Sequence, residues 1–355
     1  MKRIAVFLPN WIGDAVMATP AIAALAKHYP AAELINVCTP YVADTLSASP
    51  WFQHRVLLQK RTPLHHWIPK ATQELRVLKP DAAVLLPNSF TPALIARLAG
   101  ARTVVGFARY YRDGLLTHRL YPHRSATSKP KPSPVLLDYN RLVRLLGVPD
   151  PGHTMQLHVT AESRERADAL LNRFPPGGRL IGLNPGGAFG SSKHWADDRF
   201  AELAHRCAAN GQRVLVLCGP KERDTARRIV QFAAHPHVMS LADDDVSIDL
   251  TKAVISKLQG FVTTDSGPRH IAAAFGVPVV ALFGPTHQEW TSTFFDLETR
   301  LQKRVPCGPC QLRTCPVNHR CMTELSAAEV HSALTQVLAR RQARQPVRQE
   351  RRHAG

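Results

Sequence analysis

Three loops of the sequence combine glycine with charged or hydroxyl side chains, and each follows a short apolar run. In the first, residues 9–14 (PNWIGD), a glycine turn delivers a carboxylate to the start of a helix. We interpret Asp14 as a candidate general base that accepts the proton of a substrate hydroxyl. The alternative is a capping role, because aspartate is among the residues preferred at helix N-termini.

The second loop, residues 184–193, offers backbone N–H groups, hydroxyls and a lysine, a combination that suits phosphate. Gly187, Ser191 and Ser192 are candidate phosphate contacts, and Lys193 is a candidate for neutralising a diphosphate leaving group. The GxxxxGK[ST] spacing is absent, which argues against ATP hydrolysis. The alternative for Lys193 is a solvated loop lysine.

The third loop opens a helix at Asp265, Ser266 and Gly267, and His270 follows within its first turn. A helix N-terminus presents unpaired N–H groups and a partial positive charge, which suits pyrophosphate. We expect Asp265 to orient a sugar hydroxyl and His270 to contact phosphate, against the alternatives of a capping aspartate and a packed histidine. Glu222 follows another apolar run and is a candidate ribose contact.

Buried strands that alternate with helices must position these loops. We expect strands at residues 3–8, 33–38, 55–58 and 82–86, then at 180–183, 213–217, 238–241, 260–264 and 279–283. This pattern predicts an α/β protein with two Rossmann-like, doubly wound parallel sheets. The predicted divisions are a first Rossmann-like domain (1–155), a second Rossmann-like domain (156–338) and a basic, disordered tail (339–355). Two such domains facing each other would place a donor and an acceptor on opposite walls of one cleft.

Composition agrees with two globular domains, since the chain has 355 residues and is 45% apolar. Its formal charge of +18 indicates an acidic partner, whether nucleic acid, an anionic membrane or a phosphorylated substrate. Apolar runs are too short to span a bilayer, and the first residues lead into a strand rather than a signal peptide. We therefore expect a cytoplasmic protein, whose tail carries six arginines against one glutamate.

Cys307, Cys310, Cys315 and Cys321 are spaced closely enough to bind zinc. They lack the paired CxxC motifs of a zinc ribbon, so we favour a loop of reduced thiols over a metal site. The acidic run at residues 243–245 has the Asp-x-Asp spacing of metal-dependent sugar transferases, yet it is more typical of a solvated turn.

Together the loops resemble glycosyltransferase family 9, the lipopolysaccharide heptosyltransferases, from about residue 3 to about residue 338. The matching features are Gly13-Asp14, the loop 184–193 with His194-Trp195, residues 264–267 with His270, and residues 283–286 (FGPT). The resemblance implies a GT-B fold and inverting transfer from ADP-heptose with no metal or other cofactor, with an acceptor-binding first domain (1–155) and a donor-binding second domain (156–338). It assigns Asp14 as the catalytic base, Lys193 as the phosphate-neutralising lysine, Glu222 as the ribose contact, and Asp265, Ser266, Gly267 and His270 as the donor loop.

Within the family, residues 9–14, residues 86–90 and the cysteine segment look more like members that add heptose to the first heptose of the core. The alternatives are members that add the first heptose or transfer another nucleotide sugar. The implied acceptor is a phosphorylated inner-core glycolipid, reached by a monomer at the cytoplasmic face of the inner membrane. Candidate acceptor contacts are Asn10, Asn88, Ser89, Arg109 and Arg112.

Two unrelated functions remain as alternatives. A nucleic-acid-binding protein with a zinc knuckle would explain the charge and the cysteines, but it leaves the three loops without a purpose. A dinucleotide-dependent oxidoreductase shares the predicted fold, but the first turn lacks G-x-G-x-x-G.

Overall fold

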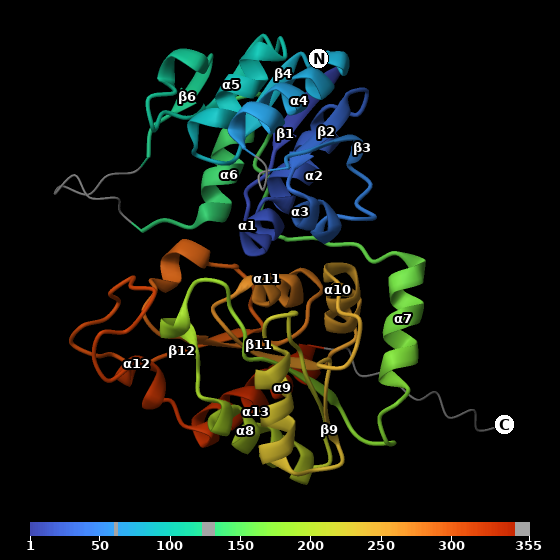
Figure 1. Cartoon of the computed structure of the whole chain (residues 1–355), viewed down its shortest axis with the longest axis vertical. Helices are drawn as coiled ribbons and strands as arrows, with labels where there is room; N and C mark the ends of the chain where they lie inside the picture. Colours follow the sequence, from blue (N-terminus) through green and yellow to red (C-terminus); the bar gives the residue numbers. More distant parts are fainter. Residues whose placement is uncertain (60–62, 123–131, 345–355) are drawn as a thin grey trace.

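The strands form two separate six-stranded parallel sheets in a computed structural model that describes residues 1–59, 63–122 and 132–344 (Figure 1). The first sheet contains, in spatial order, β3 (Phe52–Leu57), β2 (Glu33–Cys38), β1 (Arg3–Phe7), β4 (Ala82–Leu85), β5 (Thr103–Phe107) and β6 (His118–Leu120). The second contains β12 (Glu298–Gln302), β11 (Val279–Phe283), β10 (Gly260–Thr264), β7 (Leu180–Asn184), β8 (Arg213–Val216) and β9 (Val238–Ser240). The first order is that of a Rossmann sheet, which changes winding direction between β1 and β4.

Helices connect consecutive strands, as parallel pairing requires. Around the first sheet they are α1 (Ile12–Met17), α2 (Thr19–His28), α3 (Pro40–Thr45), α4 (Leu64–Val77), α5 (Phe90–Leu98) and α6 (Val135–Arg144), with a 3₁₀ turn η1 (Asp113–Leu115). The second half has α7 (Ala161–Leu171), α8 (Asp197–Ala209), α9 (Arg223–Ala233), α10 (Ile248–Ser256), α11 (Gly267–Ala274), α12 (Arg320–Thr323) and α13 (Ala327–Arg344), with η2 (Ser191–Lys193) and η3 (Gln288–Thr291).

Both faces of the first sheet are buried, which explains the unbroken apolar runs in its central strands. Along β1, Ile4 and Val6 belong to one apolar cluster and Ala5 and Phe7 to another, because successive side chains point to opposite faces. The loops after the strands can therefore carry polar groups while the strands themselves supply the core.

Helices α1 and α11 bring the two halves into direct contact (Figure 1). A β-carbon at Gly13 would lie 2.7 Å from Cδ2 of His270, and one at Gly267 would lie 3.1 Å from Cβ of Ile12. Two glycines thus permit a backbone approach that larger residues would prevent. This approach places the first turn of α1 against the first turn of α11.

A buried lysine makes a second contact between the halves. Lys252 of α10 is fully buried, and its ammonium donates to the main-chain carbonyls of Asp44, Thr45 and Ser47 at 3.2, 3.2 and 3.4 Å. It also donates to Oγ of Ser47 at 2.7 Å and pairs with Asp249 at 3.1 Å. The lysine thereby joins α10 to the last turn of α3 and the residues that follow it.

Replacing Lys252 by methionine should lower the free energy of unfolding by about 1–3 kcal/mol, because several buried acceptors lose their donor. Chemical denaturation followed by circular dichroism measures the change. The matched control is Lys257→Met near the end of the same helix, since Lys257 pairs with Asp168 in a partly exposed ion pair. That control should cost at most about 1 kcal/mol. Equal effects of the two variants would contradict a special role for Lys252.

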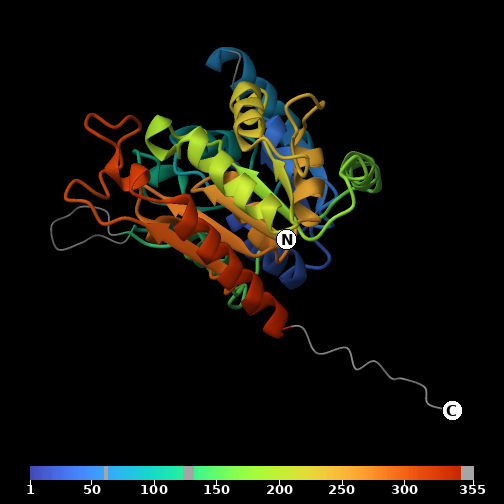
Figure 2. The same ribbon diagram turned by 90° about the horizontal axis from the view of Figure 1, so that it is seen from below.

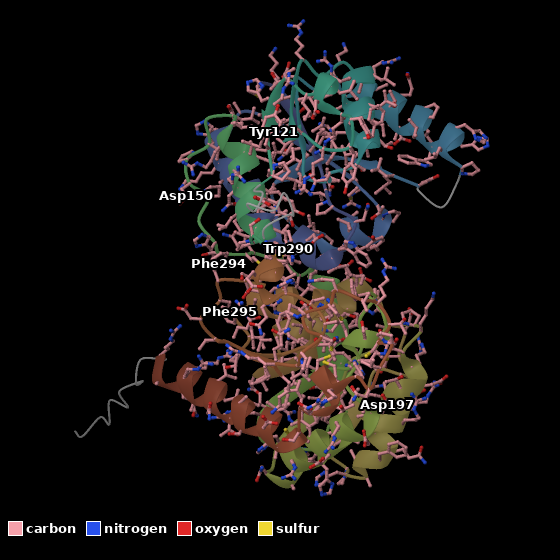
Figure 3. The ribbon with its side chains drawn as sticks, turned by 90° about the vertical axis from the view of Figure 1, so that its left-hand side faces the viewer. Tyr121, Asp150, Asp197, Trp290, Phe294 and Phe295 are labelled. Carbon is pink, nitrogen blue, oxygen red and sulfur yellow. The ribbon has the colours of Figure 1, made fainter. Side chains whose placement is uncertain are left out.

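The chain crosses between the sheets through the segment from Arg144 to Ala161, and the predicted division at residue 155 stays a prediction. His153 in this segment stacks on Phe294 of the second half, with ring centroids 4.3 Å apart. Figure 3 places Phe294 and Trp290 at the boundary between the halves. Helix α13 packs along the second sheet and continues to Arg344, so residues 339–344 of the predicted tail are helical (Figure 2). Residues 345–355 lie outside the described part of the chain.

Candidate functional site

Asp14 lies where α1 meets the second half, and its environment makes it a stronger base than a solvated aspartate. Burial, the largest cause, and the negative charge of Asp265 together raise the pKa of its carboxyl to about 6, against the opposing positive charge of Lys193. The N-cap of α1 is Trp11, so Asp14 does not cap this helix. The capping alternative is therefore wrong, and the role of Asp14 as a general base stays a prediction.

Lys193 and Asp265 form a buried ion pair at the carboxyl edge of the second sheet. Nζ of Lys193 is 2.6 Å from Oδ2 of Asp265 and donates to the same residue's carbonyl at 3.0 Å. Both residues are buried, which rules out the solvated-lysine alternative. The ammonium also lies 4.7 Å from the ring centroid of Phe189. Lys193 and Asp265 thus lie close enough to Asp14 for their charges to affect the pKa of its carboxyl.

Asp265 is held by four side chains rather than left open to a sugar. Oδ2 also accepts from Thr286 at 2.9 Å, while Oδ1 accepts from Arg269 and Thr291, each at 3.3 Å. Burial alone would raise its pKa, but Lys193 and Arg269 outweigh that effect and lower the pKa to about 2. Asp265 is therefore a buried anion that positions Lys193. The expectation that it orients a sugar hydroxyl is not supported, because donors already surround its oxygens.

Glu222 ties the loop after β7 to the end of β8. Its two carboxylate oxygens accept from the backbone N–H groups of Gly187 at 3.2 Å and Gly219 at 2.8 Å. Asn184 donates to the carbonyl of Gly186 at 3.1 Å and to Oγ of Ser266 at 3.2 Å, which joins the same loop to the start of α11. These contacts bring together the donor-side residues expected from the sequence, and their contact with a donor stays a prediction.

Ser192 and His270 differ from their expected roles. Ser192 is buried, and its Oγ donates to the carbonyl of Leu312 at 2.5 Å, so it supports the loop, whereas Ser191 is exposed. His270 is also buried, and its Nδ1 has no hydrogen-bond partner among the described residues. Burial, reinforced by the charge of Arg269, lowers its pKa to about 3, so the ring is neutral. His270 packs against Gly13 and supplies no charge for phosphate, which agrees with the packed-histidine alternative.

Among the candidate acceptor contacts, the prediction for Arg112 is wrong. It is fully buried, and its guanidinium donates to the carbonyls of Phe107, Pro87 and Ser89 at 2.8, 2.7 and 2.9 Å. Its donors are used to fix the loops after β4 and β5, so it is not available to an acceptor. Asn10 and Ser89 are exposed and Asn88 and Arg109 are half-buried, and their contact with an acceptor stays a prediction.

Within residues 1–59, 63–122 and 132–344, no group of three or more His, Cys, Asp or Glu side chains is arranged to hold a metal ion. Cys307, Cys310, Cys315 and Cys321 are all free thiols. Asp243, Asp244 and Asp245 face Arg227, Arg173 and Arg166 respectively. Across the same described residues, no helix has both the length and the apolar character needed to cross a bilayer.

Sequence patterns do not predict the buried ion pair of Arg269 and Glu298 that lies beside Asp265. Arg269 is fully buried and binds both oxygens of Glu298 on β12, at 2.5 and 3.1 Å. The available signal was the i,i+4 spacing of Asp265 and Arg269 at the start of a helix. Glu298 carried no such signal, because its partner is 29 residues away in sequence.

Comparison with known proteins identifies the family and the fold of this chain. Residues 68–320 match the model of glycosyltransferase family 9 (heptosyltransferase). A lipooligosaccharide heptosyltransferase 2 of Campylobacter jejuni is 24% identical over 92% of this chain and 96% of its own length. Escherichia coli ADP-heptose lps heptosyltransferase II superposes with a TM-score of 0.79 at 24% identity, over 96% of this chain and 100% of that one.

An Escherichia coli heptosyltransferase solved with ADP-2-deoxy-2-fluoro heptose superposes with a TM-score of 0.72 at 17% identity, over 94% of this chain and 99% of that one. These likenesses confirm the predicted fold of two facing Rossmann-like sheets, the GT-B fold. The family model covers well over half of the sequence. This chain therefore belongs to glycosyltransferase family 9, the heptosyltransferases.

Proposed function

We propose that this protein transfers heptose from ADP-heptose to the first heptose of the lipopolysaccharide inner core, with inversion at the anomeric carbon. The observation that carries the proposal is the meeting of Asp14 with Lys193 and Asp265 across the boundary between the halves. A base from one half and a cation from the other are what a transfer between two separately bound substrates needs.

In the proposed reaction, Asp14 removes the proton of the acceptor hydroxyl as its oxygen attacks the anomeric carbon of the donor. The bond between that carbon and the diphosphate oxygen breaks, and the electron pair leaves with ADP. Lys193 stabilises the negative charge that develops on the departing diphosphate. Since an amine supplies this charge, we propose that no metal or other cofactor is required.

Two neighbouring segments of the second half support the proposal that it binds the donor. The loop of Gly187 and Ser191, held by Glu222 and Asn184, faces the start of α11, where Ser266 and Gly267 offer backbone N–H groups. We assign the diphosphate to this region. The acceptor would then lie against the first half, near Asn10, Asn88, Ser89 and Arg109.

The acceptor is tested by a transfer assay with purified protein, ADP-heptose, and inner-core acceptors carrying no heptose or one heptose, in the presence of EDTA. Product from the mono-heptosylated acceptor alone supports the proposal, as does the similarity to heptosyltransferase 2 proteins. Product from the heptose-free acceptor would instead assign addition of the first heptose. A requirement for added metal would contradict the metal-independent mechanism.

We further propose that the protein acts as a monomer at the cytoplasmic face of the inner membrane, where a lipid-linked acceptor is presented. The formal charge of +18 favours contact with anionic lipid. Co-sedimentation with anionic and neutral vesicles measures this contact, and equal recovery with both would contradict it.

The pH dependence should report the ionisation of Asp14. Because the carboxylate is the active form and its pKa is about 6, kcat/KM should fall about tenfold per pH unit below pH 6 and level off above it. An anionic donor near Asp14 disfavours the carboxylate, so the pKa seen in kcat should be higher than that in kcat/KM. Initial rates between pH 4.5 and 8.5 measure both, and a profile that is flat through pH 6 would exclude Asp14 as the base.

A further inference from the structure

The ion pair of Lys193 and Asp265 continues into two buried charges that the proposed chemistry does not use. Arg269 of α11 is fully buried, and Glu298 of β12 has a side chain only 1% exposed. Nε and Nη2 of Arg269 donate to the two oxygens of Glu298 at 2.5 and 3.1 Å, and Nη1 lies 3.3 Å from Oδ1 of Asp265. The four charges alternate in sign from Lys193 to Glu298.

Asp265 therefore carries one negative charge between two cations. Lys193 approaches Oδ2 at 2.6 Å, and Arg269 approaches Oδ1 at 3.3 Å. Either cation alone would balance the charge of this carboxylate. Lys193 also donates to the carbonyl of Asp265, so two of its three donors face this residue rather than a ligand.

A lysine that binds diphosphate must give up part of this contact. The Asp265 side chain is only 3% exposed, and removing the sole partner of a buried charge is strongly unfavourable. Arg269 prevents that situation because it stays beside Oδ1 when Lys193 turns away. Its planar guanidinium is fixed by both oxygens of Glu298, by Thr291 at 2.9 Å and by the ring of Phe283 at 4.8 Å.

We infer that Arg269, held in place by Glu298, is a positioning residue that keeps Asp265 neutralised while Lys193 shifts from Asp265 to the diphosphate of the donor. The inference rests on the proposed role of Lys193 in donor binding. It explains why a second, fully buried cation lies behind Lys193 and Asp265.

The experiment measures the affinities of ADP and adenosine by calorimetry. Where adenosine binds too weakly for direct titration, its affinity is measured by competition with ADP. The main variant is Arg269→Met combined with Glu298→Gln, which removes one charge of each sign and leaves no unpaired buried carboxylate at position 298. Lys193 then becomes the only cation beside Asp265. We expect the Kd of ADP to rise at least about tenfold, while the Kd of adenosine changes less than about twofold.

Arg300→Met is the matched control, since Arg300 donates to Glu298 at 2.8 Å and, among the described residues, forms no hydrogen bond or ion pair with Asp265. We expect ADP affinity in this variant within about twofold of the wild type. Arg269→Lys retains the charge but loses the two-pronged contact, and it should give an intermediate Kd for ADP. It also serves if the double variant does not fold, as judged by circular dichroism.

Equal weakening of ADP and adenosine, or no weakening of either, would overturn the inference, because a general disturbance of α11 would not select the diphosphate. In a Lys193→Ala background, Arg269→Lys should cause no further change in ADP affinity, because Asp265 keeps one cation and no lysine has to leave it. An additive loss there would also overturn it. If Lys193→Ala alone leaves ADP affinity unchanged, the proposed function of Lys193 fails instead, and the two failures are thereby distinguished.

Discussion

Asp14→Asn is expected to lower kcat about 10²–10⁴-fold while leaving ADP affinity nearly unchanged. The amide preserves the shape of the carboxylate but cannot accept the proton of the acceptor hydroxyl. Asp14 stands on α1 in the first half, whereas the proposed diphosphate site belongs to the second. The neutral amide should therefore change ADP affinity only slightly, toward tighter binding, because it removes a negative charge near the anionic donor. Single-turnover transfer rates and ADP calorimetry measure the two quantities separately.

The matched control for this variant is Asp198→Asn in the first turn of α8. Asp198 is exposed, and its neighbour Asp197 lies in the second half well away from the boundary between the halves (Figure 3). The control should retain wild-type kcat. If Asp14→Asn also retained it, Asp14 would have no part in proton transfer.

Lys193→Ala should lower kcat/KM for the donor about 10²–10³-fold, because the departing diphosphate loses its nearest cation. Asp265 keeps Arg269 as a counter-charge in this variant, so we expect the fold to persist. Steady-state kinetics with the donor varied at saturating acceptor measure the effect, and ADP calorimetry should show weaker binding.

Two further variants sharpen the test of Lys193. Lys193→Arg keeps the positive charge with a different geometry and should recover part of the loss. Lys303→Ala removes a surface lysine that pairs with Glu329 at 2.6 Å and should leave kcat/KM unchanged. Wild-type kinetics in Lys193→Ala would show that the lysine only supports the loop, as Ser192 does.

The central strands follow from the sequence because they are buried on both faces. The runs that form β10 and β11 are continuous apolar or small residues between turn signals, and the run of β2 is apolar apart from Glu33 and Asn36. The predicted bounds of all three strands agree with the structure. The edge strands β6 and β12 have no such run. β12 has the sequence ETRLQ, and its charged residues are accommodated by ion pairs with Arg269 and Arg300 rather than by apolar packing.

In the candidate site, the residues that a local sequence pattern indicates were predicted, and the contacts between distant segments were not. The sequence of each of three separate loops indicated Asp14, Lys193 and Asp265, because each loop follows the carboxyl end of a strand. It could not show that Asp265 faces inward or that Arg112 turns its guanidinium onto main-chain carbonyls. Those orientations depend on contacts between segments far apart in sequence.

The close approach at Gly13 and Gly267 has a consequence for the chemistry of Asp14. The carboxylate owes its raised pKa to burial at this seam and to Asp265, which belongs to the other half. Drawn apart, the halves would return Asp14 to water and toward the acidity of an ordinary aspartate, making it a weaker proton acceptor. The basicity of Asp14 thus depends on both halves of the protein, and the carboxylate reaches its full proton affinity only when the halves are in contact.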